Sequence, residues 1–220
     1  MAPAPAAINA PEPVTKPLDG RVFGVLPNYR TGNLHDTYRP LTAKQKYYIG
    51  YKDSTDYPLF LLGGGLALIG QWADQHEEYG QGVQGFAKRW GASTADQLIG
   101  NILTESVLPS LLHQDPRYLR KGEGTKKARV GYAATRIFVA KNDNGRWAFN
   151  YTEVLGNALS AGIANAYYPG ERSVSDNIQR LYSQLATDAI SQVLKEFWPD
   201  IKRRMHRKSA AQSYLDPPKN

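Results

Sequence analysis

The side chains best suited to chemistry lie in the segment TESVLPSLLHQDPRY, residues 104–118. Glu105 falls on an otherwise apolar turn, and His113 follows a little over two helical turns later, on roughly the same face. Together with Asp115 they could form a general acid/base set or part of a metal site. Arg117 or Tyr118 would then stabilise developing negative charge. This pattern indicates a hydrolase or lyase.

The same residues also have a structural interpretation, which we favour. The sequence DPRY is a turn signal in which Asp115 caps, and Arg117 could pair with a buried carboxylate such as Glu105. The chain contains no HExxH, no GxSxG and no glycine-rich phosphate loop of known spacing. We therefore expect no metal and no cofactor, and the acid/base set remains the alternative hypothesis.

The formal charge of +7 is concentrated in two stretches. Residues 117–136 carry a net charge of +6, residues 202–208 carry +5, and the rest of the chain is mildly acidic at −4. Such patches can meet anionic lipid, a polyanionic envelope polymer or nucleic acid, or can simply be solvated. The candidate anion-binding residues are Arg120, Lys121, Lys126, Lys127, Arg129, Lys202, Arg203, Arg204, Arg207 and Lys208.

Helical patterns fill most of the chain after residue 42. We expect helices from Lys44 to Tyr51 with Thr42 as cap, from Pro58 to about Ala73, and from Gly82 to Leu112. A further helix should run from Asn150 to Tyr168, and a last one from Ser173 or Ser175 to Trp198, where Pro199 interrupts it. The Ala and Arg content of Ala128 to Ala140 favours a helix, but residues 136–150 fit a hairpin with a tight turn equally well.

The second of these helices is uncharged and apolar, but it is shorter than the roughly 20 residues of a membrane span. A buried core helix is therefore favoured over an interfacial or tilted membrane helix. Polar residues within the later helices, such as Asn157, Asp188 and Glu196, should form an internal hydrogen-bond network.

Small residues recur four apart in several helices, which lets helix backbones approach closely. Examples are Gly63 with Ala67, and Gly156 with Ser160 and Ala164. The predicted fold is a mainly α single-domain bundle of about five or six helices with Gly/Ala-rich packing, a short extended N-terminal arm and a small β-hairpin. Its expected parts are a disordered Pro/Ala-rich linker at 1–20, the helical domain at 21–204 and a basic, frayed tail at 205–220.

Six segments of the chain resemble a family of uncharacterised exported proteins from environmental Gram-negative bacteria. They are GVLPNYRT (24–31), LTAKQKYYIGYKDSTD (41–56), YGQGVQGFAKRWGASTADQLIGN (79–101), LPSLLHQDPRYLRKGEGT (108–125), FNYTEVLGNALSAGIANAYYP (149–169) and VLKEFWPDI (193–201). Family members typically carry a signal peptide. The resemblance, which covers residues 21–204, implies export and a single domain, and it implies no catalytic residue.

The sequence therefore predicts a non-enzymatic protein of the periplasm or cell envelope, from which a signal peptide has been removed. Its expected partner is an anionic membrane surface or an envelope polymer, which the basic segments would contact. The sequence leaves open whether the chain forms a homo-oligomer. Nucleic acid is not expected as a partner, because export would separate the protein from it.

Overall fold

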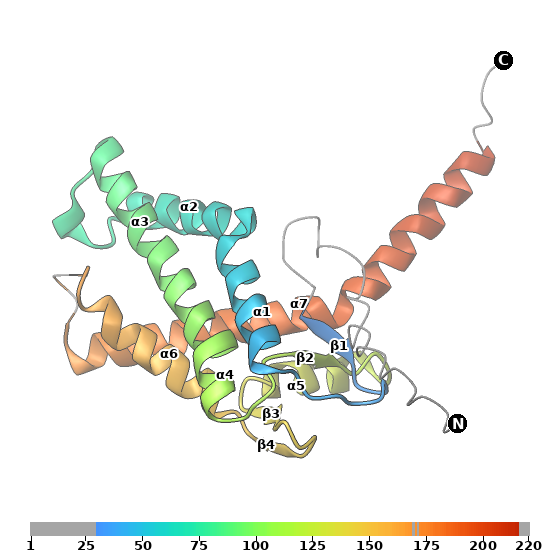
Figure 1. Ribbon diagram of the computed structural model, residues 1–220. Helices are drawn as coiled ribbons and strands as arrows, with labels where there is room; N and C mark the ends of the chain where they lie inside the picture. The colour runs from blue at the N-terminus through green and yellow to red at the C-terminus, as the bar shows by residue number, and fades with distance from the viewer. Residues whose placement is uncertain (1–29, 169, 171, 216–220) are drawn as a thin grey trace, which may run out of the picture.

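The structure, a computed structural model, describes residues 30–168, 170 and 172–215, with side chains up to Met205. The chain is mainly helical, as the sequence predicts (Figure 1). The expected linker at 1–20 and all but the last residue of the expected arm at 21–30 lie outside the described residues. The elements are β1 (Thr31–Asn33), α1 (Ala43–Thr55), α2 (Tyr57–Trp72), a 3-10 turn (Glu77–Tyr79), α3 (Gly82–Asn101), a π-helical segment (Ile102–Val107), α4 (Leu108–Leu111), β2 (Tyr118–Arg120), α5 (Lys126–Thr135), β3 (Val139–Lys141), β4 (Trp147–Phe149), α6 (Tyr151–Ala164) and α7 (Val174–Leu215).

Local capping signals set the starts of the helices. The Thr42 hydroxyl accepts from the Gln45 N–H, and the Gln45 side chain accepts from the Thr42 N–H, so α1 begins with a capping box. Pro58 lies in the first turn of α2, and the Asn150 side chain accepts from the Glu153 N–H at the start of α6. The predicted starts of these three helices are confirmed to within one or two residues.

The long helix predicted from Gly82 to Leu112 is continuous, but its centre is wound differently. After α3 the backbone forms a π-helical segment over Ile102–Val107, and α4 follows directly with Pro109 in its first turn. Short π segments mark positions where a helix is adapted to a function or to strain. Here the segment places Glu105 in the centre of the molecule.

Two short sheets tie the loops together. Strands β1 and β2 pair in parallel, and β3 and β4 pair as an antiparallel hairpin. Of the two alternatives for residues 136–150 the hairpin is correct, and the helix before it, α5, ends at Thr135 and not at Ala140. Helix α6 ends at Ala164 rather than at Tyr168.

Helix α7 differs most from its prediction, because it does not end at Pro199. It continues to Leu215, and its C-terminal part extends beyond the other helices in Figure 1. Proline removes one helical hydrogen bond and crowds the preceding turn. The carbonyl that loses its bond is that of Lys195, four residues before Pro199. The next carbonyl, of Glu196, accepts bonds from Arg120 Nε and Arg129 Nη2, both at 2.8 Å, so side chains of other elements hold this turn.

Helices approach closely where small residues face a neighbour. A Cβ atom on Gly63 would lie 2.6 Å from Thr94 Oγ1 in α3, and one on Gly156 would lie 2.6 Å from Thr104 Cγ2. A Cβ atom on Gly91 or on Gly162 would have no neighbouring heavy atom within 4 Å. The small-residue packing predicted for α2 and α6 is therefore confirmed at these two glycines.

This contrast within α6 gives a stability prediction. Gly156→Ala should lower the free energy of unfolding by about 1–3 kcal/mol, because the added methyl group overpacks the contact with Thr104. Gly162→Ala on the same helix should raise the free energy of unfolding by up to about 1 kcal/mol through helix propensity. Urea denaturation of both variants measures the difference. Equal effects would show that α6 does not pack closely against the π-helical segment.

Candidate functional site

The structure divides the predicted acid/base set among separate neighbourhoods. Glu105 is 1 % exposed, and its Oε1 lies 2.7 Å from Nη1 of Arg30. The His113 side chain is 81 % exposed and lies 3.6 Å from Asp143, while the Tyr118 hydroxyl donates to Glu196 at 2.7 Å. General acid/base catalysis requires its groups to be within hydrogen-bond reach of one substrate. The expected convergence of these side chains is not what the structure shows.

Asp115 and Arg117 instead pair with each other. The Arg117 backbone N–H and its Nε both donate to Asp115, at 3.0 and 2.9 Å, and Arg117 Nη2 donates to the Arg39 carbonyl at 2.7 Å. The guanidinium also lies over the ring of Tyr38. The expected ion pair of Arg117 with Glu105 is therefore wrong in its partner, although Arg117 does fix a loop. Arg117 pairs with Asp115 and not with Glu105 because Asp115 is only two residues away in the same turn.

Two of the candidate anion-binding arginines are buried in an internal network centred on Glu196. Its carboxylate accepts from Arg129 Nε at 2.7 Å, from Tyr118, and from the backbone N–H groups of Lys121 and Gly122 at 3.0 and 2.9 Å. Glu196 is fully buried, and the predicted need of this residue for polar partners is confirmed.

One turn later, Asp200 extends the same network. It lies 2.6 Å from Arg129, 3.4 Å from Arg120 and in contact with Arg203. These guanidinium groups hold the pKa of the Asp200 carboxyl below its usual range, against the opposing effect of burial. Arg120 and Arg129 thus fasten β2 and α5 to α7 and are not available to an external anion.

The remaining candidate cations are placed differently. The exposed ones are Lys126, Lys127, Arg203 and Arg204, while Lys121 and Lys202 are half-buried. The side chains of Arg207 and Lys208 lie outside the described part of the chain. The basic segments therefore contribute fewer external charges than the sequence indicates.

A second group of buried charges surrounds Arg30 in the centre of the molecule. Arg30 bridges Glu105, at 2.7 Å, and Asp53, at 3.4 Å, and Lys195 of α7 is 4 % exposed nearby. Burial is the main effect that raises the pKa of Glu105, with Arg30 opposing it and Asp53 adding to it. Burial and the charge of Arg30 lower the pKa of Lys195 to about 8.

The group adjoins a cavity of about 290 Å³ between α2, α3 and α7. Its apolar lining residues are Pro58, Leu59, Leu62, Ile190 and Leu194. The other lining residues are charged or polar, among them Arg30, Asp53, Glu105, Asp188 and Lys195. A cavity of this size is at the lower end of the range of small-molecule sites, about 300–1,000 Å³.

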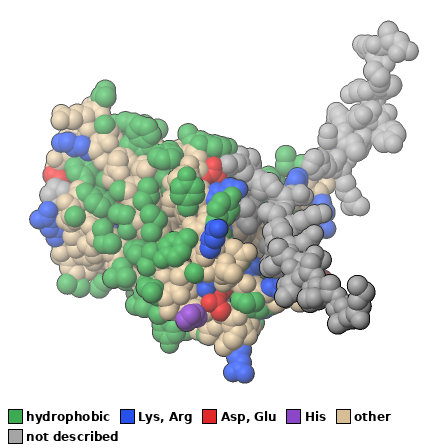
Figure 2. Space-filling model, viewed as in Figure 1, with side chains coloured by type: hydrophobic (Ala, Val, Ile, Leu, Met, Phe, Trp, Pro, Cys, Tyr) green, Lys and Arg blue, Asp and Glu red, His purple; other side chains and the backbone are tan. Residues whose placement is uncertain are grey.

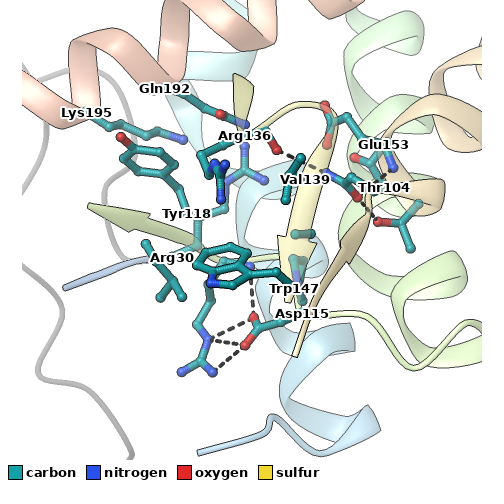
Figure 3. A pocket seen from close by; sticks show the side chains of 16 residues that line it. Arg30, Thr104, Asp115, Tyr118, Arg136, Val139, Trp147, Glu153, Gln192 and Lys195 are labelled. Carbon is teal, nitrogen blue, oxygen red and sulfur yellow. Dashed lines mark hydrogen bonds and ion pairs between the residues drawn. The ribbon is translucent and has the colours of Figure 1, made fainter. Parts of the chain in front are cut away.

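Water-sized cavities continue from this group towards α6. Glu153 lines two of them, each of about 30 Å³, and Asp188 lines one. Figure 3 shows Lys195 and Tyr118 at one side of the pocket that holds Glu153, and Asp115 and Trp147 at another. Asn157 donates to Asp188 at 3.3 Å, which confirms part of the predicted internal network.

Glu153 gives a pH prediction. Burial, and secondly the neighbouring Asp188, raise its pKa well above 4.5 in the folded chain, so the folded state binds more protons than the unfolded state above that pH. The contribution of Glu153 to the free energy of unfolding therefore falls as pH rises from about 4.5. Glu153→Gln removes this fall, so the variant should gain stability relative to wild type as pH rises. Urea titrations between pH 4 and 8 test it, with the exposed Glu77→Gln as control. A relative loss of stability in Glu153→Gln would contradict the assignment.

The outer surface is unusually apolar where α1 and α2 lie. Alanine is the commonest apolar residue of the buried core in the described part of the chain, whereas many large apolar side chains face outward, as Figure 2 shows over this part of the molecule. On α1 and α2 these are Tyr47, Tyr48, Tyr51, Tyr57, Phe60, Leu61, Leu62, Leu66, Leu68, Ile69 and Trp72. We call these residues the α1–α2 apolar face. The expectation of a buried core helix at 58–73 holds only for its inner side, which includes Leu59, Gly63 and Ala67.

Sequence reasoning missed Arg30, Asp53 and Lys195 as members of one site. Asp188 and Lys195 are seven residues apart and share a face of α7, which is a spacing that could have indicated their proximity. Arg30 and Asp53 gave no such signal, because Arg30 contacts Glu105 from a distant part of the sequence.

Within residues 30–168, 170 and 172–215, no helix combines the length and the apolar character that crossing a membrane requires. The described side chains also include no cluster of three His, Asp or Glu groups placed to hold a metal ion. The resemblance to exported proteins stays a prediction. Comparison of the chain with protein-family models, with curated proteins and with solved structures finds no match.

Proposed function

We propose that the protein is a non-enzymatic protein of the cell envelope that associates with an anionic membrane surface. The observation that carries this proposal is the α1–α2 apolar face. Exposed apolar patches of more than a few hundred Å² are uncommon on proteins that stay alone in water, and they mark sites of contact with a membrane or another protein.

The chemistry of the face suits the boundary between lipid and water. Helix α2 has no charged residue from Tyr57 to Trp72 and presents leucine, isoleucine and phenylalanine side chains outward. Helix α1 exposes Tyr47, Tyr48 and Tyr51, with Lys44 and Lys52 also exposed on it. Tyrosine, tryptophan and lysine are the residues that gather at the headgroup level of a bilayer, where one end of the side chain is apolar and the other is wet. A helix of this kind lies in the interface without spanning it.

Exposed cations add attraction to an anionic surface. Lys126, Lys127 and Arg204 are exposed, and each cation close to an anionic leaflet contributes about 1 kcal/mol. This contribution is screened by salt, whereas burial of the apolar face is not. The basic segments are therefore the minor contact in this proposal.

The alternative function, a hydrolase or lyase, finds less support. Its candidate groups have separate partners, and the imidazole of His113 is on the outside of the molecule while Glu105 is in the centre.

Flotation with lipid vesicles tests the proposal. We expect the full chain to float with vesicles of phosphatidylglycerol and phosphatidylcholine at low salt, and to keep part of its binding at 0.5 M NaCl. The double variant Lys126→Gln with Lys127→Gln should bind less at low salt and equally at high salt. If wild type does not float at low salt, and forms dimers in light scattering instead, the apolar face is covered by a second copy and the proposal is wrong.

A further inference from the structure

Lys195 is a buried amine in the group of charges around Arg30. It is 4 % exposed, and within the described residues its ammonium forms no hydrogen bond and no ion pair. A buried charge normally requires both. Other buried cations among the described residues have such partners: Lys46 pairs with Asp143 and Arg129 with Glu196.

The Lys195 side chain lines two cavities. Lys195 lines the 290 Å³ cavity between α2, α3 and α7, and also the smaller pocket of Figure 3, where its side chain extends past Tyr118 towards the other lining residues. A small molecule in the cavity would therefore meet both the Lys195 side chain and leucine and isoleucine side chains.

We propose that Lys195 captures small aliphatic aldehydes in this cavity by forming an imine through its Nζ. The carbonyl group is the chemical class that an unprotonated amine attacks, and the apolar lining residues Leu59, Leu62, Ile190 and Leu194 accommodate an alkyl chain of a few carbons. This inference does not rest on the membrane proposal, because imine formation at Lys195 needs no membrane and no turnover.

The surroundings of Lys195 favour the reactive form of the amine. Burial and the neighbouring charge of Arg30 lower its pKa to about 8, although Asp53, Glu105 and Asp188 act in the opposite direction. These are the same two effects, desolvation and a nearby cation, that activate lysines for Schiff-base chemistry. At pH 7 to 8 a substantial part of Lys195 is therefore neutral, unlike an exposed lysine.

The capture balances without an oxidant or reductant. The Nζ lone pair attacks the carbonyl carbon, the C–N bond forms, and the carbonyl oxygen takes a proton. Glu105 is suited to supply that proton, because burial raises its pKa and it lines the same cavity. The nitrogen returns a proton to the carboxylate, the hydroxyl is protonated and leaves as water, and the nitrogen lone pair forms the C=N bond. One aldehyde and one amine thus give one imine and one water.

Reductive trapping tests this proposal on the full chain. The protein is mixed with substoichiometric n-hexanal and sodium cyanoborohydride at pH 7, and the alkylated lysines are located by peptide mass mapping. We expect Lys195 to be labelled at least tenfold faster than the exposed Lys126 and Lys127, and Lys195→Arg to lose this fast labelling. Equal or slower labelling of Lys195 in the wild-type chain would overturn the proposal, whether or not Lys195→Arg folds.

Two comparisons separate capture in the cavity from general reactivity. Leu62→Trp should narrow the apolar wall and slow the labelling of Lys195 several-fold, while labelling of Lys126 stays unchanged. Glycolaldehyde, which has no alkyl chain, should label Lys195 more slowly than n-hexanal does. If Leu62→Trp and glycolaldehyde both leave the rate at Lys195 unchanged, the cavity is not the site of capture.

Discussion

Replacing Glu196 with glutamine is expected to lower the free energy of unfolding by about 3–5 kcal/mol. The substitution keeps the shape of the side chain but removes the negative charge that faces Arg129 at 2.7 Å. The arginine would stay buried with only Asp200 to balance it, and the Tyr118 hydroxyl and the N–H groups of Lys121 and Gly122 would lose a charged acceptor. Breaking one side of a buried ion pair is costly because the other charge remains.

Thermal and urea unfolding measure this effect. For a chain of this length, 3–5 kcal/mol corresponds to a decrease in Tm of about 6–20 °C. The control is Glu123→Gln, whose side chain is exposed, and this variant should change stability by less than about 0.5 kcal/mol. A loss below about 1 kcal/mol in Glu196→Gln would contradict the role of Glu196 as the residue that fastens β2 and α5 to α7.

The second large effect is expected on α2. The double variant Leu61→Glu with Leu68→Glu should reduce vesicle binding about a hundredfold or more. Both side chains are more than half exposed, so the change leaves the interior of the bundle intact. Burial of a leucine side chain is worth about 1.5–3 kcal/mol, so losing two of them removes about 3–6 kcal/mol of binding, and 1.4 kcal/mol corresponds to a factor of ten.

A matched control separates the apolar contribution from net charge. Ser175→Glu with Gln179→Glu adds the same two negative charges at exposed positions near the start of α7. This control should keep its binding within a fewfold of wild type in sedimentation with phosphatidylglycerol vesicles. If both double variants lose binding equally, charge repulsion is the cause and α2 is not the contact.

The sequence predicts the parts of the fold that depend on neighbouring residues. The capping box at Thr42 and the cap at Asn150 act over three residues, and the close packing at Gly156 follows from the absence of a side chain. The continuation of α7 through Pro199 could not be predicted in this way. The turn before Pro199 is held by Arg120 and Arg129, which are far away in the sequence and bond the Glu196 carbonyl.

The candidate site was predictable only in its individual members. Glu105, Asp188 and Glu196 stand out as polar residues in apolar helices, and each is found in a polar network. Their partners are not deducible, because Arg30 and Lys195 reach the cavity from opposite ends of the chain. Likewise, the spread of basic residues over 117–136 does not reveal that Arg120 and Arg129 face inward. Composition cannot separate a solvated charge from one that fastens two elements together.

Trp72 allows the most direct test of the membrane proposal. It lies at the end of α2 and is 89 % exposed, whereas Trp198 is buried. With vesicles containing brominated phospholipids, we expect the wild-type fluorescence to be quenched and shifted to shorter wavelength. Trp72→Phe should lose most of this quenching, and Trp147→Phe should keep it. Quenching that is absent in wild type, or unchanged in Trp72→Phe, would contradict insertion of the α1–α2 apolar face into the membrane surface.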